Sequence, residues 1–379
     1  MAVPLRVPIL KIPFGQNDAD FITEELRRLL LTGQLAMGPN VKKFEDEFAK
    51  FITTPYACGA TNGTAALEMI FRALEVEGGS VAITANTFMA TAMAAIASGA
   101  KIILVDCHID DYQMDADDLA RKMRPDTKAV VLVHVGGFIS KSYEKIKEIA
   151  QSHGAALIED AAHAHGAEIY GQKAGSLGFA GAFSFFPTKV LTTAEGGMVT
   201  TSDPKLYERL LALRQHGQNA PGSNIHQNFG LNFRPSEIHA LLGLRMMAKA
   251  DEILAQRRKA AAIYDALLSN GPVKAVIPQE GLKPSYYKYM AILPEGVDRG
   301  AIKARLREDF GVALAGEVYA TAGNLQPLWT SHPQFLAHPL SPLPALEKLA
   351  PRQICLPIYP GLSYEDQKYV VESLHEVVA

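Results

Sequence analysis

Two ionisable residues, Asp160 and Lys189, have types and positions that could carry chemistry. Asp160 closes the apolar run AALIED, and Lys189 follows the apolar run GAFSFF by three residues. A carboxylate at the end of a buried strand is costly unless a cation or hydrogen-bond donor is near. A lysine amine in such a place can bond to a carbonyl carbon. Each residue alone has a simpler interpretation, Asp160 as a cap at the end of a strand and Lys189 as a solvated charge. A catalytic role for the pair therefore needs further support.

A second group of residues could bind a phosphate. Asn62, Gly63 and Thr64 open a predicted helix, where free backbone N–H groups and the helix dipole favour an anion. Ser184, five residues before Lys189, could add a hydroxyl donor. An ordinary capped helix start would explain the first three residues equally well.

Two rings could enclose a flat cofactor. Phe88 follows a predicted strand, and His163 lies three residues after Asp160. Each could otherwise be a plain core side chain. A pyridinium ring that carries an aldehyde and a phosphate needs an anion, a lysine, phosphate donors and flat contacts. Because the sequence offers a candidate for each, it favours pyridoxal 5'-phosphate (PLP) as a cofactor, with Lys189 and Asp160 as the central pair.

The elements that must position these residues alternate along the first half of the chain. Strands are predicted at residues 80–84, 101–105, 129–133 and 155–158, and helices at residues 18–31, 41–51, 63–74, 87–97, 116–124 and 143–153. Asp18 is the predicted cap of the first helix. Apolar strands separated by helices indicate a mostly parallel sheet that is covered on both faces. Ligands bind such sheets at the carboxyl ends of the strands, where Asp160 lies.

The second half of the chain predicts a different organisation. Residues 236–268 form one long helical stretch, or two joined helices, and short strands and helices follow. The length of the chain favours two lobes. We expect a large domain at residues 1–250 and a smaller α+β domain at residues 251–379.

The composition excludes several classes of function. The 379 residues are 48% hydrophobic and carry a net charge of −3, without the basic block of a nucleic-acid surface. No apolar run approaches the ~18 residues of a membrane span, and prolines interrupt the apolar start of the chain. Three scattered cysteines and a lone HxH argue against disulfides and a zinc site. We therefore expect a cytoplasmic protein that binds no metal, nucleic acid or membrane.

Eight segments closely resemble the DegT/DnrJ/EryC1/StrS aminotransferases. They are, from the N-terminus onward, TGQLAMGPNVKKFEDEFAKF, TNGTAAL, EDAAHAHGA, FSFFPTK, AEGGMVTT, LRQHG, GLNFRPSEIHALLG and CLPIYPGLSYEDQKYVV. The resemblance covers nearly the whole chain. It implies the type I PLP-dependent aminotransferase fold. That α/β fold has a large domain, with a mostly parallel sheet covered by helices, and a smaller C-terminal α+β domain.

The resemblance also implies a role for the residues around the ring. Lys189 would bond to the aldehyde carbon of PLP, and Asp160 would pair with the pyridine N–H. His163 would stack on or beside the ring, and Phe88 would pack against the other side. Lys189, Asp160 and His163 are thus the expected catalytic residues.

The phosphate would be held by residues of two chains. Asn62, Gly63, Thr64 and Ser184 would bind it within one subunit. Asn232, in the GLNFRPSE segment, would contact the phosphate of the partner chain's cofactor. The resemblance therefore implies a homodimer with shared active sites.

Members of this family mostly transfer an amino group from glutamate or glutamine to a keto-sugar, usually a nucleotide-linked one. The resemblance implies the same activity here. A keto-cyclitol or another cyclic ketone stays an alternative acceptor, and a non-catalytic PLP-binding regulator an alternative function. A relative that removes a hydroxyl has histidine in place of the lysine, so Lys189 favours transfer. The sequence lacks the GxGxxG turn of a nucleotide-sugar dehydrogenase.

Three segments depart from the commoner family pattern. Val318-Tyr319 and Leu325-Gln326 stand where many members have a His-Tyr pair and a Leu-His pair near the substrate. The segment HVGGFISK, at residues 134–141, replaces a His-hydrophobic-Tyr-Gly form. The sequence therefore does not identify the acceptor.

Overall fold

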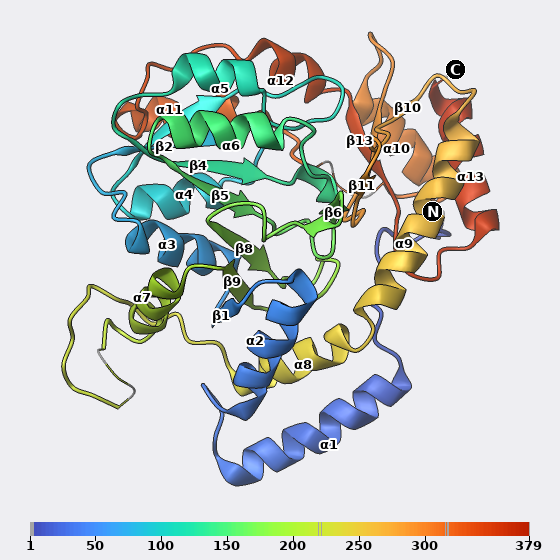
Figure 1. Cartoon of the computed structure of the whole chain (residues 1–379). Coiled ribbons are helices and arrows are strands. Elements are labelled where there is room, and N and C mark those ends of the chain that lie inside the picture. Colours follow the sequence, from blue (N-terminus) through green and yellow to red (C-terminus); the bar gives the residue numbers. More distant parts are fainter. Residues whose placement is uncertain (1–3, 219, 221, 315, 317, 379) are drawn as a thin grey trace.

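The chain folds around a seven-stranded sheet. Figure 1 shows the computed structural model, which describes residues 4–218, 220, 222–314, 316 and 318–378. The strand order is β1-β9-β8-β5-β4-β2-β3. The strands are β1 (Tyr56–Ala60), β2 (Ser80–Thr84), β3 (Lys101–Val105), β4 (Thr127–Val133), β5 (Ala156–Asp160), β8 (Ala180–Ser184) and β9 (Gly197–Thr201). Strands β3, β2, β4, β5 and β8 are parallel, whereas β9 is antiparallel to both β8 and β1. This confirms the predicted α/β class with a mostly parallel sheet.

Helices cover both faces of this sheet. Helices α3 (Gly63–Ala73), α4 (Ala90–Ala97) and α7 (Pro204–Arg214) pack on one face, and α5 (Ala116–Lys122) and α6 (Tyr143–Ser152) on the other (Figure 1). Strands β2 and β4 are almost wholly buried, because a parallel sheet between two helical layers has no wet face.

The N-terminal helices lie beside the sheet and differ in detail from the prediction. Helix α1 (Gln16–Thr32) packs against α8 (Glu237–Met247), and α2 (Pro39–Ile52) packs against α8 and β1. The N-cap of α1 is Gly15, so the predicted cap Asp18 is wrong. Asp18 accepts a hydrogen bond from the Gly15 amide and forms ion pairs with Arg245 and Lys249. These distant cations, which local sequence cannot reveal, determine its role.

The rest of the chain builds a second sheet. The long helical stretch is two helices, α8 and α9 (Ala250–Leu268), joined at residues 248 and 249. A three-stranded sheet of β10 (Lys274–Ala275), β12 (Tyr289–Ile292) and β13 (Gln353–Leu356) packs near α10 (Arg299–Phe310) and α13 (Tyr364–Val378) (Figure 1). Strand β11 (Leu282–Lys283) instead pairs with β6 (Glu168–Ile169), which also pairs with β7 (Gln172–Lys173).

One segment of the second half returns to the large sheet. It contains the short helices α11 (Pro327–Ser331) and α12 (Pro344–Leu349). The Ala337 amide donates to the Ile102 carbonyl of β3, and the Asp106 carboxylate accepts from two amides of α12. Division of the chain at residue 250 stays a prediction.

None of the helices in the described part of the chain is both long and apolar enough to cross a membrane.

Candidate active site

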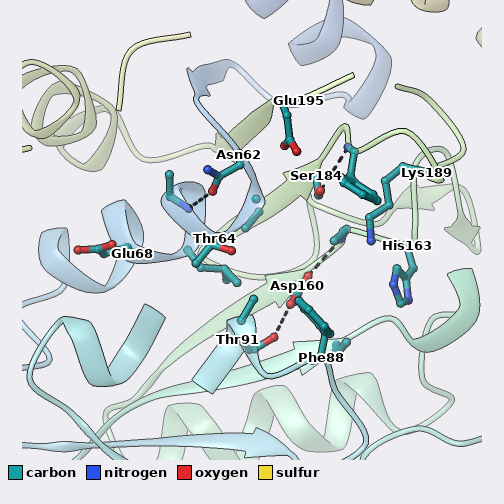
Figure 2. Close-up of a pocket in the computed structure, with 18 of the residues that line it drawn as sticks. Asn62, Thr64, Glu68, Phe88, Thr91, Asp160, His163, Ser184, Lys189 and Glu195 are labelled. Atoms are coloured by element: carbon teal, nitrogen blue, oxygen red, sulfur yellow. Dashed lines mark hydrogen bonds between the residues drawn. The ribbon is translucent and has the colours of Figure 1, made fainter. Parts of the chain in front are cut away.

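A large cavity lies at the carboxyl end of the parallel sheet. Its volume is about 820 Å³. It is bounded by the ends of β4, β5 and β8 and by the start of α3, and the side chains of its lining converge there (Figure 2). Every predicted cofactor residue lines it: Asn62, Gly63, Thr64, Phe88, Asp160, His163, Ser184, Lys189 and Asn232. The position agrees with the rule for ligand sites in parallel sheets.

Asp160 is the last residue of β5 and presents its carboxylate to the cavity. Its side chain is only 8% exposed. One carboxylate oxygen accepts a hydrogen bond of 2.7 Å from the Thr91 hydroxyl of α4, and the other accepts from the Ala162 amide (Figure 2). These two donors fix the orientation of the carboxylate at the edge of the cavity. Asp160 can therefore offer an anion to a cationic ring nitrogen.

Glu159, the neighbouring carboxylate, has a different environment. It is fully buried and bonds to the His134 ring at 2.8 Å. It also accepts hydrogen bonds from three backbone amides, those of residues 175, 177 and 178. Successive side chains of a strand point to opposite faces, which separates Glu159 from Asp160. Glu159 anchors a loop, and Asp160 is the carboxylate that lines the cavity.

Lys189 follows β8 and extends into the cavity beside Tyr287. Its Nζ lies 4.8 Å from the centre of the Tyr287 ring. The Tyr287 hydroxyl lies 3.1 Å from the hydroxyl of Thr188, which fixes the loop next to Lys189. Burial lowers the pKa of Lys189, and the nearby Lys288 lowers it further, whereas Tyr287 and Asp160 raise it. The net lowering favours a neutral, nucleophilic amine.

The start of α3 and strand β8 form a cradle that fits a phosphate. The Asn62 side chain caps α3 by accepting from the Ala65 amide at 2.8 Å. The amides of Gly63 and Thr64 precede the first helical hydrogen bond, which Ala66 donates. Such amides at a helix start bind anions.

Close backbone approach shapes the same cradle. A Cβ at Gly63 would lie 2.7 Å from the Cβ of Ser184, and one at Gly197 would lie 2.1 Å from the Asn62 carbonyl oxygen. Glycine is thus required at both positions. The cradle brings the Ser184 hydroxyl to the same wall of the cavity as the amides of α3 (Figure 2), so the residues present fit a phosphate group.

The two predicted ring contacts differ in their surroundings. Phe88 lines the cavity but is 67% exposed. His163 is buried, and one face of its ring stacks on Tyr287 with 4.2 Å between ring centres. No described group bonds to its Nδ1 atom. Burial lowers the pKa of His163, so its ring is neutral. His165, the other histidine of the HxH, is a core residue among phenylalanines.

Asn232 lines the cavity of its own chain, although the resemblance implies contact with the partner's cofactor. The residue is exposed and lies opposite Gln215 in a short β-bridge. Its neighbours in the segment, Phe229 and Leu231, are also exposed. A single chain places Asn232 near the site without assigning it to either subunit, so the shared site stays a prediction.

Sequence reasoning missed four residues of the site. Thr91 holds Asp160, Glu195 lines the cavity, and Tyr287 and Lys288 form the wall beside Lys189. The sequence does contain a signal for Thr91, because Thr87 and Thr91 share one face of a predicted helix. In the structure their hydroxyls lie 2.9 Å apart. Tyr287 and Lys288 carried no such signal, because they reach the site from the second half of the chain.

Comparison with known proteins places this geometry in a family. The family model of the DegT/DnrJ/EryC1/StrS aminotransferases matches residues 16–375. The chain is 33% identical to a pleiotropic regulatory protein of Geobacillus stearothermophilus, with 94% of each chain covered. It is 31% identical to the dTDP-3-amino-3,4,6-trideoxy-alpha-D-glucose transaminase of Micromonospora megalomicea subsp. nigra, with 97% of each covered.

A solved structure has the same fold over nearly the full length. DesV of S. venezuelae superposes with a TM-score of 0.90 and 29% identity, covering 99% of this chain and 98% of that one. The type I aminotransferase fold predicted from the sequence is thereby confirmed. The chain belongs to the DegT/DnrJ/EryC1/StrS aminotransferase family, a family of PLP-dependent transferases.

Proposed function

We propose that this protein binds PLP through Lys189 and transfers an amino group from glutamate or glutamine to the ketone of a nucleotide-linked sugar. One observation carries the proposal. Lys189, Asp160 and a glycine-lined phosphate cradle open into the same cavity. These groups match the needs of PLP, which are an amine, an anion and an anion-binding helix start.

The chain's own residues have separable tasks in this reaction. When bound, PLP supplies an electron sink and carries the amino group between substrates. Asp160 keeps a proton on the ring nitrogen of the cofactor. The neutral amine of Lys189, when it is not bonded to the cofactor, would move a proton to and from the α-carbon of the donor. His163 and Phe88, which both line the cavity, would contact the ring of the cofactor.

The cavity and the relatives support a nucleotide-linked acceptor. A cavity of about 820 Å³ lies within the range for sites that enclose drug-sized ligands. The Micromonospora relative is named for a dTDP-linked amino sugar. A keto-cyclitol or another cyclic ketone is the alternative acceptor, because Val318-Tyr319 departs from the commoner pair near the substrate.

Incubation with substrates tests this function. The purified protein is loaded with PLP and mixed with glutamate or glutamine and a panel of nucleotide-linked keto-sugars and keto-inositols. Mass spectrometry should find one amino-sugar product together with the keto acid of the donor. Amination of only a keto-inositol would overturn the assignment of a nucleotide-linked acceptor.

A regulatory role is the second candidate, because the Geobacillus relative is named as a regulatory protein. Lys189 in a cavity with Asp160 favours catalysis over regulation alone. The two functions differ in the donor reaction. A catalyst converts glutamate to its keto acid without any protein partner, whereas a non-catalytic regulator does not.

We also propose that the protein is a homodimer with shared active sites. Phe186 lines the cavity and is 45% exposed, and Phe229 and Leu231 are exposed in the segment that leads to Asn232. A partner subunit would cover these apolar side chains. Asn232 would then contact the phosphate in the neighbouring subunit's cavity.

A further inference from the structure

The described part of the cavity contains two lysines, and cofactor binding explains only one of them. Lys189 would be bonded to PLP. The second cation, Lys288, also lines the cavity. The other ionisable residues on the wall besides Asp160 and the neutral His163 include two glutamates, Glu68 and Glu195. Lys288 is thus the second cationic side chain among the described residues that line the cavity.

Lys288 and the reacting lysine, Lys189, both lie near the ring of Tyr287 in the lining of the cavity. Its Nζ is 5.2 Å from the centre of the Tyr287 ring, and that of Lys189 is 4.8 Å from the same centre. The charge of Lys288 also lowers the pKa of both Lys189 and His163. These two observations place its ammonium in the neighbourhood of Lys189 and His163.

The backbone holds this lysine in place through an unusual turn. The Lys288 amide donates to the Gly136 carbonyl at 3.2 Å, and the Ser285 amide donates to the Gly137 carbonyl at 3.0 Å. The Ser285 hydroxyl also donates to the His163 carbonyl at 2.7 Å. Gly136 and Gly137 both have positive φ, at 67° and 94°. The HVGG segment thus docks the chain that carries Lys288 onto the carboxyl end of β4.

Glycine at both positions is needed for this docking. A Cβ at Gly137 would lie 2.3 Å from the Ser285 hydroxyl oxygen, and one at Gly136 would lie 2.5 Å from the Met290 sulfur. The departure of this segment from the commoner family form therefore has a structural consequence. It permits the close approach that presents Lys288 to the site.

We propose that Lys288 binds the α-carboxylate of the amino-acid donor, an inference that rests on the proposed amino transfer. The α-carboxylate is attached to the carbon that bears the reacting nitrogen, so its partner must lie near Lys189. The diphosphate of a nucleotide-linked acceptor is at least a sugar ring away from the reacting carbon. A lysine beside Lys189 fits the first group, to which it can donate charge-assisted hydrogen bonds.

Two amines that differ only at the α-carbon test this assignment. L-Glutamate and 4-aminobutanoate share the same chain, but 4-aminobutanoate has hydrogen in place of the α-carboxylate. Each is added, without an acceptor, to the PLP-loaded wild type, Lys288→Met, Lys288→Arg and Lys274→Met. Lys274 is the matched control, because it is an exposed lysine of β10, which pairs with the strand that directly follows Lys288. The change in the cofactor's visible absorbance gives the apparent dissociation constant of each amine.

Lys288→Met should raise the apparent dissociation constant of glutamate by about 10- to 100-fold, as expected for loss of a hydrogen bond between charged groups. Its affinity for 4-aminobutanoate should stay within about threefold, because that amine has no group for Lys288 to bind. Lys288→Arg should retain most of the glutamate affinity, and Lys274→Met should behave as the wild type.

Three results would overturn the inference. The first is an unchanged affinity of Lys288→Met for glutamate. The second is an equal loss of affinity of Lys288→Met for both amines, and the third is a wild type that binds the two amines equally well. The second would mean that Lys288 acts through Lys189. The third needs no variant, so it decides the matter even if Lys288→Met fails to fold. A wild type that takes up no PLP would instead contradict the proposed function.

Discussion

Asp160 illustrates how the environment of one residue determines its chemistry. Its carboxylate is nearly buried and accepts hydrogen bonds from Thr91 and from the Ala162 amide. The sequence alone does not distinguish Asp160 from the adjacent carboxylate, Glu159. In the structure, the oxygens of Glu159 bond to His134 and three loop amides. Of these two carboxylates, Asp160 is therefore the one that lines the cavity.

Replacement of Asp160 by asparagine should separate binding from catalysis. Asp160→Asn should still take up PLP, because the phosphate cradle and Lys189 are intact. Amino transfer should fall by at least about 100-fold, because an amide cannot hold the ring nitrogen protonated. Thr91→Val keeps the carboxylate and should stay within about tenfold of the wild type. Stopped-flow absorbance of the donor half-reaction provides the comparison, and near-normal turnover in Asp160→Asn would mean that another carboxylate serves the ring.

The lowered pKa of Lys189 predicts a pH dependence for cofactor uptake. Burial is the main cause of the lowering. A lowered pKa means that the reactive neutral amine forms as pH rises through a value below the ~10.4 of free lysine. The rate at which PLP bonds to the apoprotein should therefore rise with pH and level off below that value. A plateau reached only above the pKa of free lysine would show that the Lys189 amine is not buried in solution.

At the scale of elements, the HVGG turn fastens the second half of the chain to the active site. Gly137→Ala places a methyl group against the Ser285 hydroxyl and the His163 carbonyl oxygen, 2.3 and 2.9 Å away. It should lower the free energy of unfolding by at least about 2 kcal/mol. It should also weaken donor binding, because Tyr287 and Lys288 move.

Gly154→Ala is the matched control for this turn. Gly154 also has positive φ, at 68°, but a Cβ there meets nothing within 4 Å. It should show only the conformational cost of alanine in a left-handed conformation, on the order of 1 kcal/mol. Thermal unfolding and the glutamate titration compare the two variants. Equal losses in both would show that backbone strain, and not the close contact, explains the glycine.

The sequence predicts elements well where local pattern determines them. Apolar runs of the right length predict β2, β3, β4 and β5 with nearly correct bounds. Strand β1, with the sequence YACGA, was not predicted because small residues give little apolar signal. Its place at the edge depends on a distant contact, since the Gly59 amide donates to the Glu45 carboxylate, which pairs with Arg214.

The same limit applies to the site. Asp160, Lys189 and the start of α3 lie next to recognisable strands and helices, so their neighbourhood can be inferred. Tyr287 and Lys288 come from a segment about 100 residues beyond Lys189. Their position follows from hydrogen bonds to Gly136 and Gly137, which a one-dimensional pattern does not encode.

At the scale of the whole molecule, the open question is which subunit Asn232 serves. Mixed dimers answer it. Lys189→Ala removes the amine, and Asn232→Asp sets a carboxylate against a phosphate, which should cripple cofactor binding. Each variant alone should be nearly inactive. If sites are shared, refolding the two variants together should restore about a quarter of wild-type sites, because each mixed dimer has one intact site.

The alternative gives a different outcome in the same experiment. If Asn232 serves the cavity that it lines in its own chain, every site in the mixed dimer has one lesion. Activity would then stay near zero even though mass spectrometry detects mixed dimers. That result would remove the shared site and leave the assignment of Lys189 unaffected.

The most direct test of the whole account is to find the lysine that carries the cofactor. The purified protein should be yellow, and reduction with borohydride followed by peptide mapping should find a phosphopyridoxyl group on Lys189. Lys288 lines the same cavity and is an internal control for chemical selectivity. An adduct on Lys288 or any other lysine, or no adduct at all, would contradict the assignment of Lys189 as the residue that binds PLP.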